Sequence, residues 1–273
     1  MSDIRHAAVA GTWYPGTRET LREEVDRHLA AAADRVVKNP IALIAPHAGL
    51  MYSGPVAAYA YQAVAGCHYD AVVLVGPSHF VGFEGAAIWP RGSWQTPFGD
   101  LTVDRAVAAA LMAATPALRE HPIAHLREHS LEMQLPFLGR LLPTTPIVPI
   151  VIGFQTRQIA DTLGAALGRA IAELPGRVLL VASSDLSHYH DARVAGDMDA
   201  VVVRHVSALD PDGLMSALEE EPGHACGGGP MVAVLRAARQ LGASRAEVLR
   251  YADSGDVSGD KTAVVGYMAA AIW

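Results

Sequence analysis

The stretch IALIAPHAG, residues 41–49, carries five apolar residues directly into a histidine that follows a proline. A strand with one solvent-exposed face alternates apolar and polar residues, so this unbroken run predicts a strand that is buried on both faces. Pro46 has no N–H to donate to a sheet and therefore ends the strand. We expect His47 just beyond the carboxyl end of this strand, where open α/β sheets bind their ligands.

Two further segments repeat this arrangement of an apolar run followed by a histidine. They are AVVLVGPSH, residues 71–79, and VLLVASSDLSH, residues 178–188. If the three strands are parallel neighbours, their carboxyl ends share one edge of the sheet, and His47, His79 and His188 converge there. The alternative is that each histidine caps its own strand through a backbone hydrogen bond, which explains one histidine more readily than three.

The composition is typical of a globular protein. Of the 273 residues 51% are hydrophobic, yet no apolar run reaches the roughly 18 residues that a membrane-spanning helix needs. The first residues lack the apolar core of a signal peptide, and two cysteines make no disulfide framework, so we expect a cytoplasmic location. The net charge of −7 argues against a nucleic-acid partner, which prefers a basic surface. We therefore expect a single domain over residues 1–273, with neither a nucleic-acid nor a membrane partner.

Strand and helix patterns alternate through most of the chain. The expected strands cover residues 41–45, 71–75, 85–89, 147–152, 177–182 and 262–269. The expected helices cover residues 17–32, 53–64, 104–114, 129–141, 156–174, 210–220 and 231–241, with a further long helix that ends near residue 205. Residues 94–100 and 251–256 are expected to be loops. This order predicts a three-layer α/β/α sandwich whose central sheet is largely parallel or mixed.

Histidines at positions 121, 125 and 129 are spaced by four residues. A proline lies within this spacing and no acid stands in register with it, so we expect a solvated loop for His121 and His125. His129 differs, because a helix from this point places His129 and Glu132 three residues apart on one face. The pair could serve a site from the helix start, although an acid that complements the helix dipole would also account for Glu132.

Cys226 lies in the segment HACGGGP, residues 224–230, just before an expected helix. Three glycines allow the backbone to approach another group closely, and the proline favours the first turn of a helix. A thiol near a helix N-terminus has a lowered pKa, and the thiolate is the form that binds metals or attacks electrophiles. The alternative is a small buried residue, which is the expectation for Cys67.

Seven motifs follow one another along the chain. They are AGTWYPG (10–16), APHAGLMYSG (45–54), GPSHF (76–80), EHSLEMQLPFL (128–138), SSDLSH (183–188), CGGGP (226–230) and YADSGDVSGD (251–260). Together they resemble the Memo-like family, whose bacterial members are called AmmeMemoRadiSam system protein B. The resemblance runs from near residue 5 to the C-terminus.

This resemblance implies a fold shared with class III extradiol ring-cleaving dioxygenases of the LigB type, in which two histidines and a glutamate bind Fe(II) and another histidine acts as the base. On these motifs, His47 and His79 take the places of the metal-binding histidines, and Cys226 stands where the dioxygenases have their carboxylate. His188 takes the place of the base, and Asp185 lines the same cleft. His129 and Glu132 match a further family motif near the site.

The cysteine is a departure from the dioxygenases, because a thiolate softens the site toward Cu(I) or Zn. Fe(II) is the expected cofactor, with Cu and Zn as alternatives, and the implied function is that of a redox protein acting on a small aromatic or hydroxylated substrate. A binding or scaffold protein with a vestigial cleft stays open as an alternative. So does a zinc hydrolase with His188 or Glu132 as its base. The family name also implies an association with an AMMECR1-like protein and a radical SAM protein.

Overall fold

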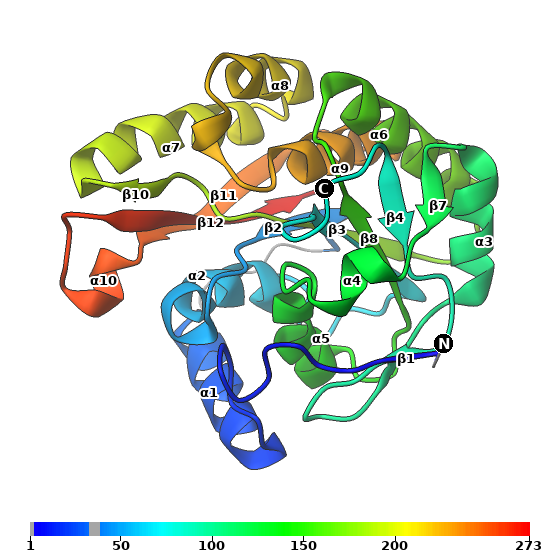
Figure 1. The fold of residues 1–273 in the computed structure, drawn as a ribbon, viewed down its shortest axis with the longest axis horizontal. Coiled ribbons are helices and arrows are strands. Elements are labelled where there is room, and N and C mark those ends of the chain that lie inside the picture. The colour runs from blue at the N-terminus through cyan, green and yellow to red at the C-terminus, as the bar shows by residue number, and fades with distance from the viewer. Residues whose placement is uncertain (1–2, 33–38) are drawn as a thin grey trace.

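The computed structural model describes residues 3–32 and 39–273 and is built around one mixed sheet (Figure 1). The strands follow one another across this sheet in the order β10-β12-β2-β9-β3-β8-β4-β7, and β11 also pairs with β12. Their bounds are β2 Ala42–Ala45, β3 Ala71–Pro77, β4 Ala86–Ile88, β7 Leu118–Glu120, β8 Ile147–Ile152, β9 Val178–Ser183, β10 His188–His190, β11 Ala246–Asp253 and β12 Val264–Ile272.

The centre of the sheet is parallel and its flanks are mixed. Strands β2, β9, β3 and β8 are parallel neighbours, whereas β12 runs antiparallel to β2 and β4 runs antiparallel to β8. The mixed sheet expected from the sequence is therefore confirmed. Because β2, β9 and β3 lie side by side, the segments that leave their carboxyl ends begin at one edge of the sheet.

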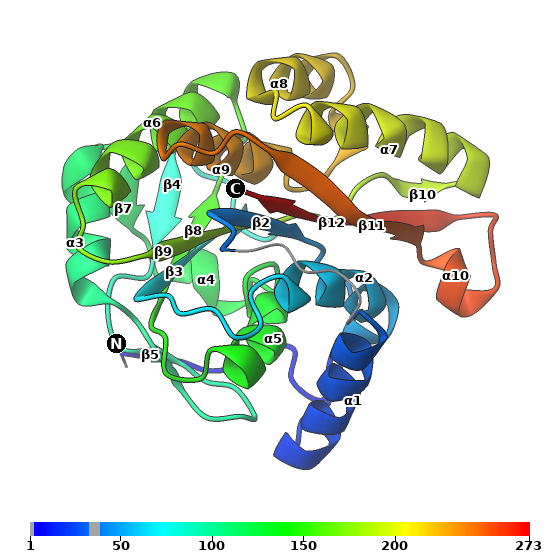
Figure 2. The same ribbon diagram turned by 180° about the vertical axis from the view of Figure 1, so that it is seen from behind.

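Helices cover both faces of the sheet, which completes the three layers (Figures 1 and 2). One face carries α1 Arg18–Ala31, α2 Leu50–Gln62, α4 Ile123–Leu126 and α5 Leu135–Leu141. The other carries α3 Arg105–Ala114, α6 Arg157–Ala172, α7 Ala192–Ser207, α8 Pro211–Glu220 and α9 Gly228–Gln240. Short helical segments are α10 Gly255–Ser258 and the 3₁₀ turns Glu132–Gln134 and Pro222–His224.

The unbroken apolar strands are explained by this double cover. Successive side chains of a strand point to opposite faces, so Ile44 packs in the core beneath α6 and α9, and Leu43 packs in the core beneath α1 and α2. All four residues of β2 are buried, as the sequence predicted for a strand with no solvent-exposed face.

A small sheet fastens the N-terminal segment to the body of the protein. Its strands are β1 Ile4–Arg5, β5 Ser93–Trp94 and β6 Leu101–Thr102. The Arg5 guanidinium lies 4.4 Å from the centre of the Trp94 ring, and both side chains are fully buried. Residues 94–100 were expected to form a loop. Trp94 instead belongs to β5, which pairs with β1 at Arg5, and β6 follows the loop.

Several element boundaries differ from the sequence-based predictions. Helix α2 begins at Leu50 rather than at 53, because Gly49 is its N-cap and Ser53 lies inside the helix, where its hydroxyl donates to the Ala48 carbonyl. Residues 251–253 belong to β11 rather than to a loop, since they pair with β12. Residues 188–190 form β10, a strand that no alternation of apolar and polar residues predicts. Within residues 3–32 and 39–273, every helix is too short or too polar to cross a bilayer.

Candidate metal centre

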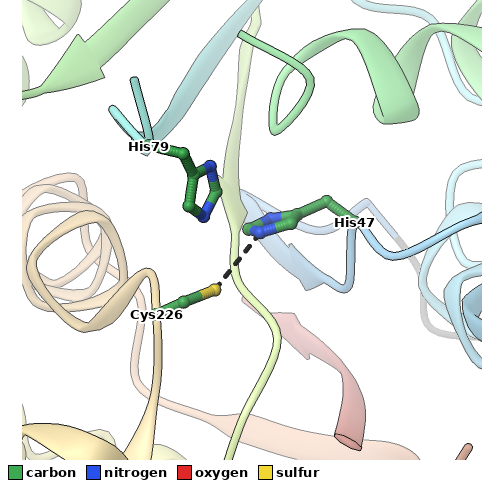
Figure 3. Close-up of side chains that lie close together, drawn as sticks. All are labelled: His47, His79 and Cys226. Carbon is green, nitrogen blue, oxygen red and sulfur yellow. Dashed lines mark hydrogen bonds between the residues drawn. The ribbon is translucent and has the colours of Figure 1, made fainter. Parts of the chain in front are cut away.

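Three loops at the carboxyl edge of the central strands bring His47, His79 and Cys226 together (Figure 3). His47 lies two residues beyond β2, His79 lies two residues beyond β3, and Cys226 precedes α9. One ligand atom from each residue lies within 4.8 Å of the ligand atoms of the other two. The two imidazole rings are 5.2 Å apart between centroids and meet edge to face. The strand-end motifs predicted that His47 and His79 meet, and the family resemblance added Cys226 to them.

His47 is buried and held from both ends of its ring. Its Nδ1 lies 2.9 Å from the Ser183 hydroxyl, and its Nε2 lies 3.2 Å from the Cys226 sulfur. Burial, with a smaller contribution from the neighbouring His79 and His188, lowers the pKa of His47 to about 3 against the opposing charge of Glu128. The imidazole is therefore neutral at physiological pH and can offer a lone pair to a cation.

His79 is oriented by Glu128, a residue that the sequence analysis did not single out. The Glu128 carboxylate accepts hydrogen bonds from His79 Nδ1 at 2.8 Å and from the His79 backbone N–H at 2.6 Å. It also accepts from the backbone N–H groups of His129 and Ser130, each at 2.9 Å. Burial alone would raise the pKa of Glu128, but these donors lower it to about 2. The carboxylate thus remains charged and turns the other nitrogen of His79 toward the site.

Cys226 lies close to the end of β9 because the residue that follows it is glycine. A Cβ at Gly227 would lie 2.4 Å from the Ser183 carbonyl oxygen, so only glycine fits there. The Cys226 backbone N–H donates to the Asp185 carbonyl at 3.3 Å. Burial raises the pKa of the Cys226 thiol well above its usual value, and the nearby Asp185 charge adds to this effect. The expected lowering of the thiol pKa is therefore not found, because burial and the Asp185 charge outweigh the hydrogen bonds that lower this pKa.

Asp185 and His188 lie next to the sulfur on its other side. Asp185, His188 and Cys226 form a second group whose ligand atoms lie within 4.8 Å of one another. The Asp185 carboxylate accepts from the His47 backbone N–H at 2.7 Å, and burial raises its pKa against this hydrogen bond. His188 Nδ1 lies 2.8 Å from the Leu186 carbonyl, which can only accept, so Nδ1 carries the proton and Nε2 is left as an acceptor. His188 thus joins the cluster through Cys226 and Asp185.

The sequence suggested that His129 and Glu132 lie on one face of a helix, but the structure places them differently. The helical segment begins only at Glu132, and His129 precedes it. His129 stacks on His79 with ring centroids 4.5 Å apart and contacts Trp13 at 4.4 Å, so it forms a wall of the site. Glu132 faces the N-terminal segment instead. It accepts from Arg5, from Tyr14 at 2.8 Å and from the backbone N–H groups of residues 8 and 9.

His125 is also placed differently from the expectation of a solvated loop. It is fully buried, with its ring edge to face against Trp94 at 5.7 Å and Trp89 at 6.1 Å. Burial lowers the pKa of His125 to about 3, and the charge of Arg5 contributes in the same direction. His121 is part-buried and contacts the Phe83 ring, so it is not a fully solvated residue either.

The buried His125 makes stability depend on pH. Between its usual pKa of 6.5 and the folded value of about 3, the unfolded chain binds a proton that the folded protein does not. Stability therefore falls as the pH drops through this range, by about 1.4 kcal/mol per pH unit for one such group. We expect His125→Phe to reduce the slope of unfolding free energy against pH by about one proton, measured by urea denaturation. His68→Gln, at a side chain that is 84% exposed, is the control, and an equal slope in both variants would contradict the assignment.

The donor set decides which group suits a metal. Among the described residues, His79, Glu128 and His129 also lie within 4.8 Å of one another. The Glu128 carboxylate, however, already accepts hydrogen bonds from four N–H groups, three of them at Oε1, and it binds His79 through Nδ1. His47, His79 and Cys226 instead bring their ligand atoms together, and the 3.2 Å contact of His47 Nε2 is with Cys226 Sγ, inside the group itself. Cys67 belongs to none of these groups.

An α/β/α sandwich with two histidines and a cysteine at the carboxyl edge of its sheet is the class of protein that these observations define. A model of the Memo-like protein family matches residues 5–271. A MEMO1 family protein from Thermotoga maritima is 36% identical over 280 aligned residues, which cover 98% of this chain and 99% of that protein. A MEMO1 family protein from Methanosarcina mazei is 38% identical over 268 aligned residues, which cover 98% of both proteins. The chain therefore belongs to the Memo-like family.

A solved structure of similar fold also matches. It is the crystal structure of an uncharacterized protein from Escherichia coli K12, with a TM-score of 0.55 and 17% sequence identity, covering 84% of this chain and 99% of that one. At this identity the match supports the fold alone.

Proposed function

We propose that this protein binds a redox-active metal ion, Fe(II) in the first place, through His47, His79 and Cys226, and that it oxidises a small hydroxylated or aromatic substrate. One observation carries the metal proposal: in each imidazole, Nδ1 is hydrogen-bonded to a protein side chain, which leaves Nε2 to face the site. Metal-binding histidines are typically oriented by this kind of outer hydrogen bond. The resemblance to class III extradiol dioxygenases favours Fe(II), while the sulfur leaves copper as the nearest alternative.

The spacing of the donor atoms suits a first-row metal ion. In a tetrahedral site with bonds of about 2.0 to 2.3 Å, neighbouring ligand atoms lie roughly 3.3 to 3.7 Å apart. His47 Nε2 and Cys226 Sγ are separated by 3.2 Å, and the whole group falls within 4.8 Å. Small side-chain rotations would therefore complete the site.

A bound Fe(II) would supply Lewis acidity and one-electron exchange with O₂. The residues around the metal would accept the proton that the substrate hydroxyl loses. His188 has its Nδ1–H committed to the Leu186 carbonyl, so its Nε2 can take a proton from a substrate hydroxyl. The buried Asp185 carboxylate, close to His188, would stabilise the imidazolium that this transfer creates. His129 and Trp13 would enclose the substrate on the other side of His79.

Metal analysis after anaerobic purification tests this proposal. We expect about one iron per chain and oxygen uptake when catechols are added. Stoichiometric zinc without oxygen uptake would favour a hydrolase. Failure to bind iron, copper or zinc in an intact fold would instead favour a binding protein, and either result would overturn the redox proposal.

Replacing His188 tests the proton transfer separately from metal binding. We expect His188→Gln to lower turnover by about 100-fold or more, the usual contribution of a general base, while metal content is unchanged. His190→Gln, two residues further along the same strand, is the matched control and should keep full turnover. Full turnover in the His188 variant would exclude this residue as the base.

A further inference from the structure

A chain of buried hydrogen bonds leads from the helix layer to the back of His47. Its members are Tyr61, Gln134 and Ser183, each with an exposed fraction of 0%, and His47 with 1%. Tyr61 lies on α2, Gln134 precedes α5, and Ser183 ends β9, so the chain joins three elements behind the metal centre. Because water does not reach these side chains, each of their hydrogen-bond donors needs an acceptor among the surrounding protein groups.

The orientation of Gln134 is fixed by its partners. One atom of its amide lies 3.1 Å from the Pro46 carbonyl, which can only accept a hydrogen bond, so this atom is Nε2. The other atom, Oε1, accepts from the Tyr61 hydroxyl at 2.8 Å. The second hydrogen of the Gln134 amide therefore points to the Ser183 hydroxyl, 2.7 Å away.

The Ser183 hydroxyl has one hydrogen and two lone pairs to distribute. It gives its hydrogen to the Ser130 carbonyl at 2.7 Å and accepts one from Gln134. Its remaining lone pair faces His47 Nδ1 at 2.9 Å. The hydrogen bond between these two atoms can form only if His47 Nδ1 carries the proton.

We infer that Ser183 and Gln134 are positioning residues that fix His47 as the Nδ1–H tautomer, so that Nε2 always presents a lone pair to the metal centre. The inference deepens the proposed function, because it states how the protein keeps one ligand ready for metal. In the metal-free protein the Cys226 thiol then donates to Nε2, which accounts for the 3.2 Å contact between them. Without the Ser183 acceptor, a proton on Nε2 becomes an allowed state and blocks coordination.

Two measurements on the whole protein test this inference. Long-range ¹H–¹⁵N NMR correlations of the metal-free protein report which nitrogen of His47 carries the proton, and titration with Co(II) reports metal affinity and thiolate coordination. We expect the Nδ1–H pattern in the wild type. In Ser183→Ala we expect a mixture of tautomers and a Co(II) affinity that is lower by about 10- to 100-fold, the usual effect of an outer-shell residue.

Ser53→Ala is the matched control, because it also removes a buried hydroxyl that donates to a carbonyl near His47, at Ala48, without touching the imidazole. It should leave both the tautomer and the Co(II) affinity unchanged. An Nε2–H pattern in the wild type would overturn the inference whether or not the protein binds metal, and equal Co(II) affinities in the two variants would do the same. A wild type that shows Nδ1–H but binds no metal would instead count against the proposed function alone.

Discussion

Glu132→Ala is expected to lower the free energy of unfolding by about 3 to 5 kcal/mol, the usual cost of removing one partner of a buried ion pair. Arg5 and Glu132 are both fully buried, and their side chains are in direct contact. Without the carboxylate, the buried guanidinium would keep the Trp94 ring and the backbone carbonyls of His125 and Glu128 but would lose its counter-charge. The Tyr14 hydroxyl would also lose its acceptor, which adds to the loss. Urea denaturation measures the change.

An exposed ion pair provides the control for this prediction. Arg140 and Asp26 are each 42% exposed at the side chain, and Arg140 Nε lies 2.6 Å from the carboxylate. We expect Asp26→Ala to cost no more than about 1 kcal/mol, because solvent screens the pair. Similar losses for the two variants would show that burial does not determine the strength of the Arg5 contact. The Glu132 variant should also loosen the segment that holds Trp13 against His129.

Cys226→Ser should reduce metal affinity sharply while the fold stays intact. A four-ligand zinc site gains about 10 to 16 kcal/mol, so one ligand accounts for roughly 3 to 4 kcal/mol, or several hundred-fold in affinity. Serine keeps the size of the side chain but does not offer a thiolate, the softer donor. Isothermal titration with Fe(II) under anaerobic conditions, or with Zn(II), gives the affinity, and circular dichroism monitors the fold.

Cys67→Ser separates coordination from a general loss of thiol. Cys67 belongs to none of the metal-ligand groups among the described residues, so its replacement should leave affinity unchanged. Unaltered metal content in the Cys226 variant would remove the sulfur from the coordination sphere. Equal weakening by both variants would indicate that thiol oxidation, rather than coordination, had been measured.

The sequence was most informative where local patterns and topology agree. The buried strand ending at Pro46 and the similar strand before His79 became neighbours of β9 in a parallel sheet, so their histidines met at one edge. Cys226 joined them because Gly227 allows close contact with the end of β9. The sequence did not predict strands β10 and β11, because both carry polar residues. They form by pairing with β12 rather than through an apolar pattern of their own.

The electrostatics of the site depend on burial, which no spacing of residues reveals. The helix N-terminus suggested a thiolate at Cys226, but desolvation raises the pKa of this thiol. Glu128 was missed because it lies outside any regular element, although it begins the motif EHSLEMQLPFL that supported the family resemblance. The shared helix face expected for His129 and Glu132 is not found, and the partner of Glu132, Arg5, lies 127 residues away in the sequence.

The distance along the chain between His47 and Cys226, 179 residues, would have a consequence for when the protein could acquire the proposed ion. During synthesis, both histidines and their strands leave the ribosome long before the cysteine does, and a nascent chain offers the cation an incomplete set of donors. Loading with the proposed metal would then follow completion of the domain instead of guiding it. If the proposed ion binds the folded protein and not the unfolded chain, the free energy of unfolding would rise with the logarithm of the free metal concentration. The melting temperature of this protein would accordingly report the metal supply of the cell that made it.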